Sequence, residues 1–76
     1  MPNNQSKLVS SKALAEAAKE SYDAIDHWSE KGLLEFKRSG RRRLYNLSLL
    51  SRIKRIRELQ ERGYSLDAIR DTLSKN

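Results

Sequence analysis

The chain has 76 residues, no cysteine and a net charge of +6 at pH 7, with 37% hydrophobic and 34% charged residues. A chain of this length forms one domain with a thin core, and the lack of cysteine excludes disulfides and thiolate metal sites. Residues 37–57 carry nine Lys or Arg and no Asp or Glu, whereas both flanks are slightly acidic. This focused positive charge is typical of a protein that binds a polyanion; the alternative is a solvated basic surface that keeps the domain soluble.

Several classes of function are excluded by what the sequence lacks. Residues 1–7 are polar, unlike a signal peptide, and the apolar runs are too short to span a bilayer. We therefore expect a cytoplasmic protein with no membrane partner. His27 is the only histidine, and there is no glycine-rich phosphate loop, so we expect no metal site, no cofactor and no enzymatic activity.

The chain is expected to begin with a flexible arm, residues 1–9, followed by a single domain, residues 10–76. Ser10 or Ser11 is a suitable N-cap, because a serine hydroxyl accepts from the first backbone N–H groups of a helix. Residues 12–19 follow and are rich in strong helix formers. The pattern therefore predicts a first helix there.

A second helix is predicted over residues 22–31, with Ser21 as its N-cap. Ile25 and Trp28 lie three residues apart, so they form a narrow apolar face that can pack on the first helix. Gly32 is expected to end the helix, because glycine readily adopts the left-handed conformation that follows a helix terminus.

Residues 34–38 and 42–45 alternate partly between apolar and charged side chains. Gly40 lies between them, so the pattern predicts a hairpin that turns at this glycine. Its tip is densely basic.

Two further helices are predicted after the hairpin. Asn46 is the expected N-cap of the third, Gly63 is expected to end it, and Glu58 and Arg62 are expected to form an i,i+4 ion pair along it. Its apolar side is formed by Leu49, Leu50, Ile53, Ile56 and Leu59. Ser65 is expected to cap the last helix. Its apolar side is formed by Leu66, Ile69 and Leu73.

Two helices, a hairpin and two helices follow the order of a winged helix-turn-helix, a mostly α fold with a small β-hairpin as the wing. Three segments carry a closer resemblance: Glu30-Lys31-Gly32-Leu33-Leu34, then Arg43-Leu44-Tyr45, then Ile56-Arg57-Glu58-Leu59-Gln60-Glu61-Arg62-Gly63-Tyr64-Ser65-Leu66-Asp67-Ala68-Ile69. Over about residues 12–74 the chain resembles the MerR-type DNA-binding domain. The resemblance implies binding of double-stranded DNA, with the second helix in the major groove and the hairpin on the phosphates. The dimerisation helix and effector domain of full-length MerR regulators are expected to be missing, so no small-molecule effector is expected.

The basic hairpin is the main candidate for DNA contact, because an arginine fork bonds phosphate oxygens bidentately. Its candidate residues are Lys37, Arg38, Arg41, Arg42 and Arg43. The alternative is an exposed basic turn without a partner. Arg52 and Arg55 on the third helix are further candidates, whereas Lys54 and Arg57 on that helix can instead pair with Glu58 and Glu61.

The second helix departs from the family pattern. Asp23, Asp26 and Glu30 form a stripe of carboxylates roughly opposite its apolar face, where the major groove is expected. MerR-type domains usually have arginine at the position of Asp26, and glycine and valine at Lys19 and Glu20. We expect weak base readout, with Asp23 accepting from a cytosine amino group; alternatively, the helix lies shallowly and the acids are solvated.

The aromatic residues divide into two groups. Trp28 and Tyr45 are expected in the core, which needs large apolar side chains. Tyr22 lies in the first turn of the second helix and can reach a thymine methyl or a phosphate. His27, whose neighbour Asp23 is a simple side-chain partner, completes the candidate DNA contacts on this helix.

Two hypotheses follow. The first is a small DNA-binding protein, either a transcription regulator or an architectural factor such as a phage or mobile-element excisionase, that can self-associate on DNA repeats. The second is a protein-interaction module with the same fold, in which the carboxylate stripe holds a basic protein partner.

Overall fold

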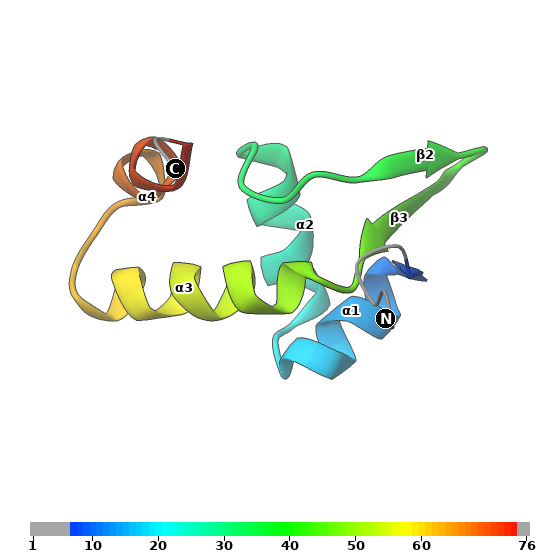
Figure 1. The fold of residues 1–76 in the computed structure, drawn as a ribbon, viewed down its shortest axis with the longest axis horizontal. Helices are drawn as coiled ribbons and strands as arrows, with labels where there is room; N and C mark the ends of the chain where they lie inside the picture. The colour runs from blue at the N-terminus through cyan, green and yellow to red at the C-terminus, as the bar shows by residue number, and fades with distance from the viewer. Residues whose placement is uncertain (1–6, 75–76) are drawn as a thin grey trace, which may run out of the picture.

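The computed structural model describes residues 7–74, which form four helices and three short strands. In chain order they are β1 (Leu8–Ser10), α1 (Ser11–Ala18), α2 (Tyr22–Glu30), β2 (Lys37–Ser39), β3 (Arg42–Asn46), α3 (Leu49–Glu61) and α4 (Leu66–Ser74). The hairpin of β2 and β3 and helix α4 lie at opposite ends of the molecule, and α2 stands between them (Figure 1). The predicted fold class, a winged helix-turn-helix arrangement, is confirmed.

Helices α1 and α2 form the helix-turn-helix pair. Of the two candidate caps of the first helix, Ser10 is the N-cap and Ser11 is the first helical residue, and α2 begins after Ser21 as predicted. Ser10 Oγ accepts a hydrogen bond from Ala13 N at 3.1 Å, and Ser21 Oγ accepts one from Ala24 N at 3.0 Å. Lys19 begins the three-residue turn between them with a φ of 59°, in the left-handed region. A side chain is tolerated there at a cost, which is why glycine is preferred after a helix.

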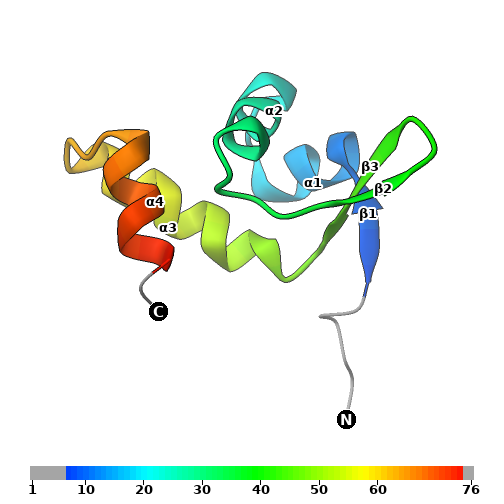
Figure 2. The ribbon, with the colours of Figure 1, turned by 90° about the horizontal axis from the view of Figure 1, so that it is seen from above.

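The hairpin turns at Gly40, as predicted. Ser39 pairs with Arg42, so Gly40 and Arg41 are the two central residues of the turn. Gly40 has a φ of 65°, and a positive φ at the first central position is the feature of a type II′ turn. This turn matches the twist of the strands and lets the basic tip project from the body (Figure 2).

The prediction of a flexible arm over residues 1–9 is wrong for the last residues of that arm. Leu8 and Val9 belong to β1, which pairs antiparallel with β3 and makes a three-stranded sheet of order β1-β3-β2. Val9 packs against the core beside Tyr45, and this burial stabilises the strand. Residues 1–6, the rest of the predicted arm, lie outside the described residues.

The start of α3 also differs from the prediction. Asn46 is the last residue of β3, and the N-cap is Ser48. Asn46 still contributes a local contact, because its Oδ1 accepts from Ser48 N at 2.9 Å in an Asx-type turn. The predicted helix end is confirmed: Gly63, with a φ of 92°, follows the C-cap of α3.

Other local predictions for the helices gave mixed results. Ser65 Oγ accepts from Ala68 N at 3.2 Å at the start of α4, as expected. The predicted Glu58–Arg62 pair is wrong, because Glu58 pairs with Arg55 one turn earlier, at 3.4 Å.

The core lies where α1, α2, α3 and the sheet meet, and α4 adds Ile69. Its buried hydrophobic residues are Leu14, Ala15, Ile25, Trp28, Leu33, Leu34, Tyr45, Ile53, Ile56, Leu59 and Ile69. The predicted burial of Trp28 and Tyr45 is confirmed. One buried polar contact connects helix and sheet: Ser29 Oγ lies 2.7 Å from the Tyr45 hydroxyl and donates to Ile25 O, also at 2.7 Å. Since serine has one hydroxyl proton, Tyr45 is the donor to Ser29.

Candidate nucleic-acid interface

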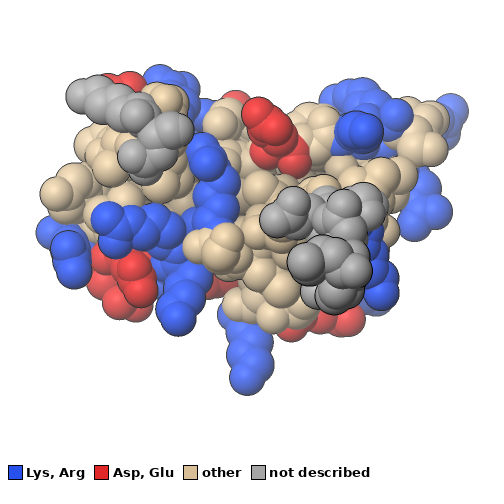
Figure 3. Space-filling model, viewed as in Figure 1, with Lys and Arg blue, Asp and Glu red and all other residues tan. Residues whose placement is uncertain are grey.

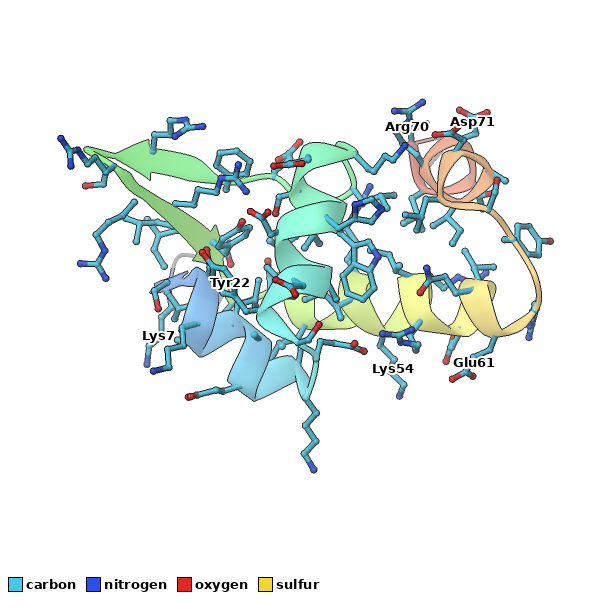
Figure 4. All side chains as sticks on the ribbon, turned by 180° about the vertical axis from the view of Figure 1, so that it is seen from behind. Lys7, Tyr22, Lys54, Glu61, Arg70 and Asp71 are labelled. Carbon is cyan, nitrogen blue, oxygen red and sulfur yellow. The ribbon has the colours of Figure 1, made fainter. Side chains whose placement is uncertain are left out.

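Three segments that are distant in the sequence meet around an open hollow of about 420 Å³. They are the start of α1, the start of α2 and the turn and second strand of the hairpin. The residues lining it are Ser10, Ser11, Lys12, Tyr22, Asp26, Arg41, Arg42 and Arg43. Tyr22 lies beside α1 near the base of the hairpin, and the residue is 56% exposed (Figure 4). The hollow therefore brings part of the predicted hairpin set together with the start of α2.

The hairpin presents its cations on two faces. Arg38 pairs directly with Arg43 across the strands, so these two side chains share a face, while Lys37 and Arg42 belong to the opposite face. Arg41 lies in the turn. All of these residues except Arg43 are exposed, and Lys and Arg gather over this end of the molecule (Figure 3).

Arg43 differs from the other cations of the hairpin because it has partners within the chain. Its Nη1 donates to Asp26 Oδ1 at 2.8 Å, and its guanidinium lies over the Phe36 ring, 4.6 Å from the centroid. The carboxylate stripe of α2 is thus partly neutralised from within, which the sequence analysis did not foresee. Asp23, His27 and Glu30 are exposed on the same helix.

The cations of α3 mostly hold the fold together. Arg52 Nε donates to Leu33 O at 2.7 Å, and Arg55 pairs with Glu58. Arg57 holds Glu20, in the turn between α1 and α2, with two hydrogen bonds, and its guanidinium lies 5.4 Å from the Trp28 ring centroid. None of these α3 arginines lines the hollow.

Lys54, also on α3, points away from the hairpin (Figure 4). Its side chain therefore extends from a different part of the surface than the hollow does.

Two arginines have raised pKa values. The Tyr45 side chain, followed by the charges of Asp26 and Glu30, raises the pKa of Arg43, and the hydrogen bond with Glu20 raises the pKa of Arg57. The raised pKa values stabilise the folded protein at every pH below the pKa that arginine has in the unfolded chain. This contribution is lost only in strong alkali. Both groups therefore stay charged near neutral pH.

Lys12 and Ser11 line the hollow but were not singled out from the sequence. From the sequence, Ser11 is a candidate helix cap, and Lys12 is one of four lysines scattered through the first 36 residues. Nothing in the local sequence distinguishes Lys12, because only the packing of α1 against the sheet brings it to the basic hairpin.

Residues 7–74 lack the features of two other kinds of site. No group of three or more His, Asp or Glu side chains in this part of the chain is arranged to hold a metal ion. Within the same range, no helix has the length and apolar character needed to cross a membrane.

A helix-turn-helix pair followed by a basic hairpin defines the chain as a winged helix-turn-helix protein. A family model described as MerR HTH family regulatory protein matches residues 9–76. The chain therefore belongs to the MerR family, whose members are DNA-binding transcription regulators. Comparison with curated proteins gave no match, and comparison with solved structures gave none either.

Proposed function

We propose that this chain binds double-stranded DNA through the face that contains the hollow, with the hairpin on the phosphate backbone and α2 directed toward the major groove. The observation that carries the proposal is the convergence of Lys12, Arg41 and Arg42 beside the exposed start of α2. Cations placed next to an exposed helix combine electrostatic attraction to phosphates with a surface for base contacts.

The proposed roles follow from chemistry and exposure. Lys37, Arg38, Arg41 and Arg42 bind phosphates, because they are exposed on a projecting ribbon. The contacts from α2 to the groove come from Tyr22, Asp23 and His27, which are exposed on its first two turns.

Arg52 and Arg55 are left out of this interface. Arg52 is committed to the Leu33 carbonyl, Arg55 pairs with Glu58, and both lie away from the hollow.

Within this function we infer regulation of transcription, in the cytoplasm, as the first role, and an architectural role of the excisionase kind as the second. An architectural factor acts by bending its site, so a circular-permutation gel assay tests the second role: an unbent site would exclude it. The alternative of a protein-interaction module is weakened by the Asp26–Arg43 pair, because an internal cation neutralises one of the three carboxylates of the stripe, which then attracts a basic partner less strongly.

The proposal is tested by the salt dependence of duplex binding in Arg41→Ala/Arg42→Ala. Each phosphate contact adds about 0.9 to the slope of log K against log salt, so the double substitution is expected to reduce the slope by about 1.8 and to weaken binding to all duplexes alike. The control, Lys19→Ala/Lys54→Ala, removes the same charge from exposed positions outside the hollow and is expected to change the slope much less. Equal effects of the two variants would show that only net charge matters and would refute this interface.

A further inference from the structure

The Asp26–Arg43 pair connects the two parts of the proposed interface. Asp26 lies on α2 and Arg43 on β3, 17 residues apart in the sequence, and their charged atoms are 2.8 Å apart. The Arg43 side chain is 21% exposed and the Asp26 side chain 43% exposed, so the pair is partly shielded from water. A shielded, well-aligned arginine–carboxylate contact holds its geometry better than a fully exposed pair.

Phe36 gives Arg43 a second support. The Phe36 ring packs against Tyr45 at a centroid distance of 5.8 Å, and both Arg38 and Arg43 lie over it, at 5.7 and 4.6 Å. Arg38 and Arg43 are directly opposite in the hairpin, where like charges repel each other. The Asp26 carboxylate and the ring face offset this repulsion.

The buried Tyr45–Ser29 hydrogen bond lies next to this pair. Asp26 and Ser29 are three residues apart on α2 and therefore share a side of the helix, while Arg43 and Tyr45 share a face of β3. The hairpin is thus attached to α2 at two points, a buried one at its base and the Asp26–Arg43 pair closer to its tip. The pairing of β3 with β1 holds the base of the hairpin, and the Asp26–Arg43 pair adds a restraint on its angle to α2 closer to the tip.

We propose that Asp26 is a positioning residue: it holds Arg43 on the Phe36 ring and thereby sets the angle between the hairpin and α2. The inference rests on the proposed function, since that angle determines whether the hairpin and α2 reach DNA together. Arg43 keeps its intramolecular partner when DNA binds, so its charge does not neutralise a phosphate.

The test variant is Asp26→Ala/Arg43→Ala, which leaves the net charge unchanged. The matched control is Arg55→Ala/Glu58→Ala, which removes an exposed i,i+3 pair on α3, 3.4 Å apart, and is also neutral in charge. Thermal melting checks that both proteins fold. If the test variant does not fold, Asp26→Asn, which keeps the side-chain size, takes its place.

Two measurements are made. Residual dipolar couplings of the free proteins report the orientation of β2 and β3 relative to α2. Salt titrations with a random duplex report affinity and slope. In the test variant we expect reduced couplings in the hairpin and about fivefold weaker binding with an unchanged slope, because preorganisation is lost while the phosphate contacts remain. The control is expected to match the wild type.

Two results would overturn the inference. Unchanged couplings in the test variant would show that Asp26 does not set the hairpin angle. A fall in slope of about 0.9 in Arg43→Ala alone would show that Arg43 binds a phosphate in the complex. Absence of duplex binding by the wild type would refute the proposed function instead, and the couplings of the free protein would still decide the role of Asp26.

Discussion

Tyr45 shows how one side chain connects the core to the proposed interface. Its ring is fully buried, its hydroxyl donates to Ser29 on α2, and the ring packs against Phe36, on which Arg43 rests. Burial of Tyr45 could be predicted from the sequence, since a small domain needs large side chains in its core. The partner of its hydroxyl could not, because Ser29 resembles any other helical serine until the sheet packs against α2.

Removing one partner of this buried hydrogen bond is expected to destabilise the fold. Tyr45→Phe should lower the free energy of unfolding by about 1 kcal/mol, and Ser29→Ala by about 1–3 kcal/mol because it leaves the tyrosine hydroxyl buried without an acceptor. The double variant should cost less than the sum of the two. Urea unfolding of all four proteins measures the coupling, and strictly additive effects would show that the hydrogen bond contributes nothing.

The short elements show where sequence reasoning succeeds and where it fails. Ser10 and Ser21 cap their helices as predicted, because a cap depends only on residues within one turn. Strand β1 was missed, because its three residues become a strand only by pairing with β3, far away in the sequence. The start of α3 was misplaced by two residues, because Asn46 completes the β3 ladder before its side chain turns the chain.

The same limit applies to the candidate site. The cations of the hairpin were recognisable as one dense local cluster. The pairing of Arg43 with Asp26, the attachment of Arg52 to the Leu33 carbonyl and the approach of Lys12 all depend on tertiary packing. The sequence therefore indicates the kind of partner more reliably than it indicates which cations are available to bind it.

The turn between α1 and α2 allows a prediction about an element. Lys19 adopts a φ of 59°, which is strained for a residue with a Cβ atom. Lys19→Gly is expected to raise the free energy of unfolding by about 0.5–1 kcal/mol, because relief of this strain exceeds the added freedom of the unfolded chain. Urea unfolding measures the effect.

The control is Ala17→Gly on the exposed side of α1, where glycine is expected to lower the free energy of unfolding by about 1 kcal/mol. A loss of stability in Lys19→Gly would contradict the strain at this turn.

At the scale of the whole molecule, the basic residues differ in whether they have partners within the fold. The basic hairpin lies at one end, whereas the arginines of α3 are largely engaged in contacts within the fold. With extents of 33 × 31 × 22 Å, the described part of the chain is large enough for the hairpin and α2 to contact neighbouring parts of one duplex. The proposed function therefore requires these two elements to bind the same DNA molecule.

The most direct test is chemical-shift mapping of the ¹⁵N-labelled chain with a random duplex of about 20 base pairs, two turns of DNA. We expect the amides of residues 37–43, of Lys12 and of the first two turns of α2 to shift together in one titration. The amides around Lys54 and Glu61, whose side chains point away from the hairpin, are expected to change little (Figure 4). Shifts confined to α3 and α4, or no shifts at low salt, would contradict the claim that the hairpin and α2 form one DNA-binding face.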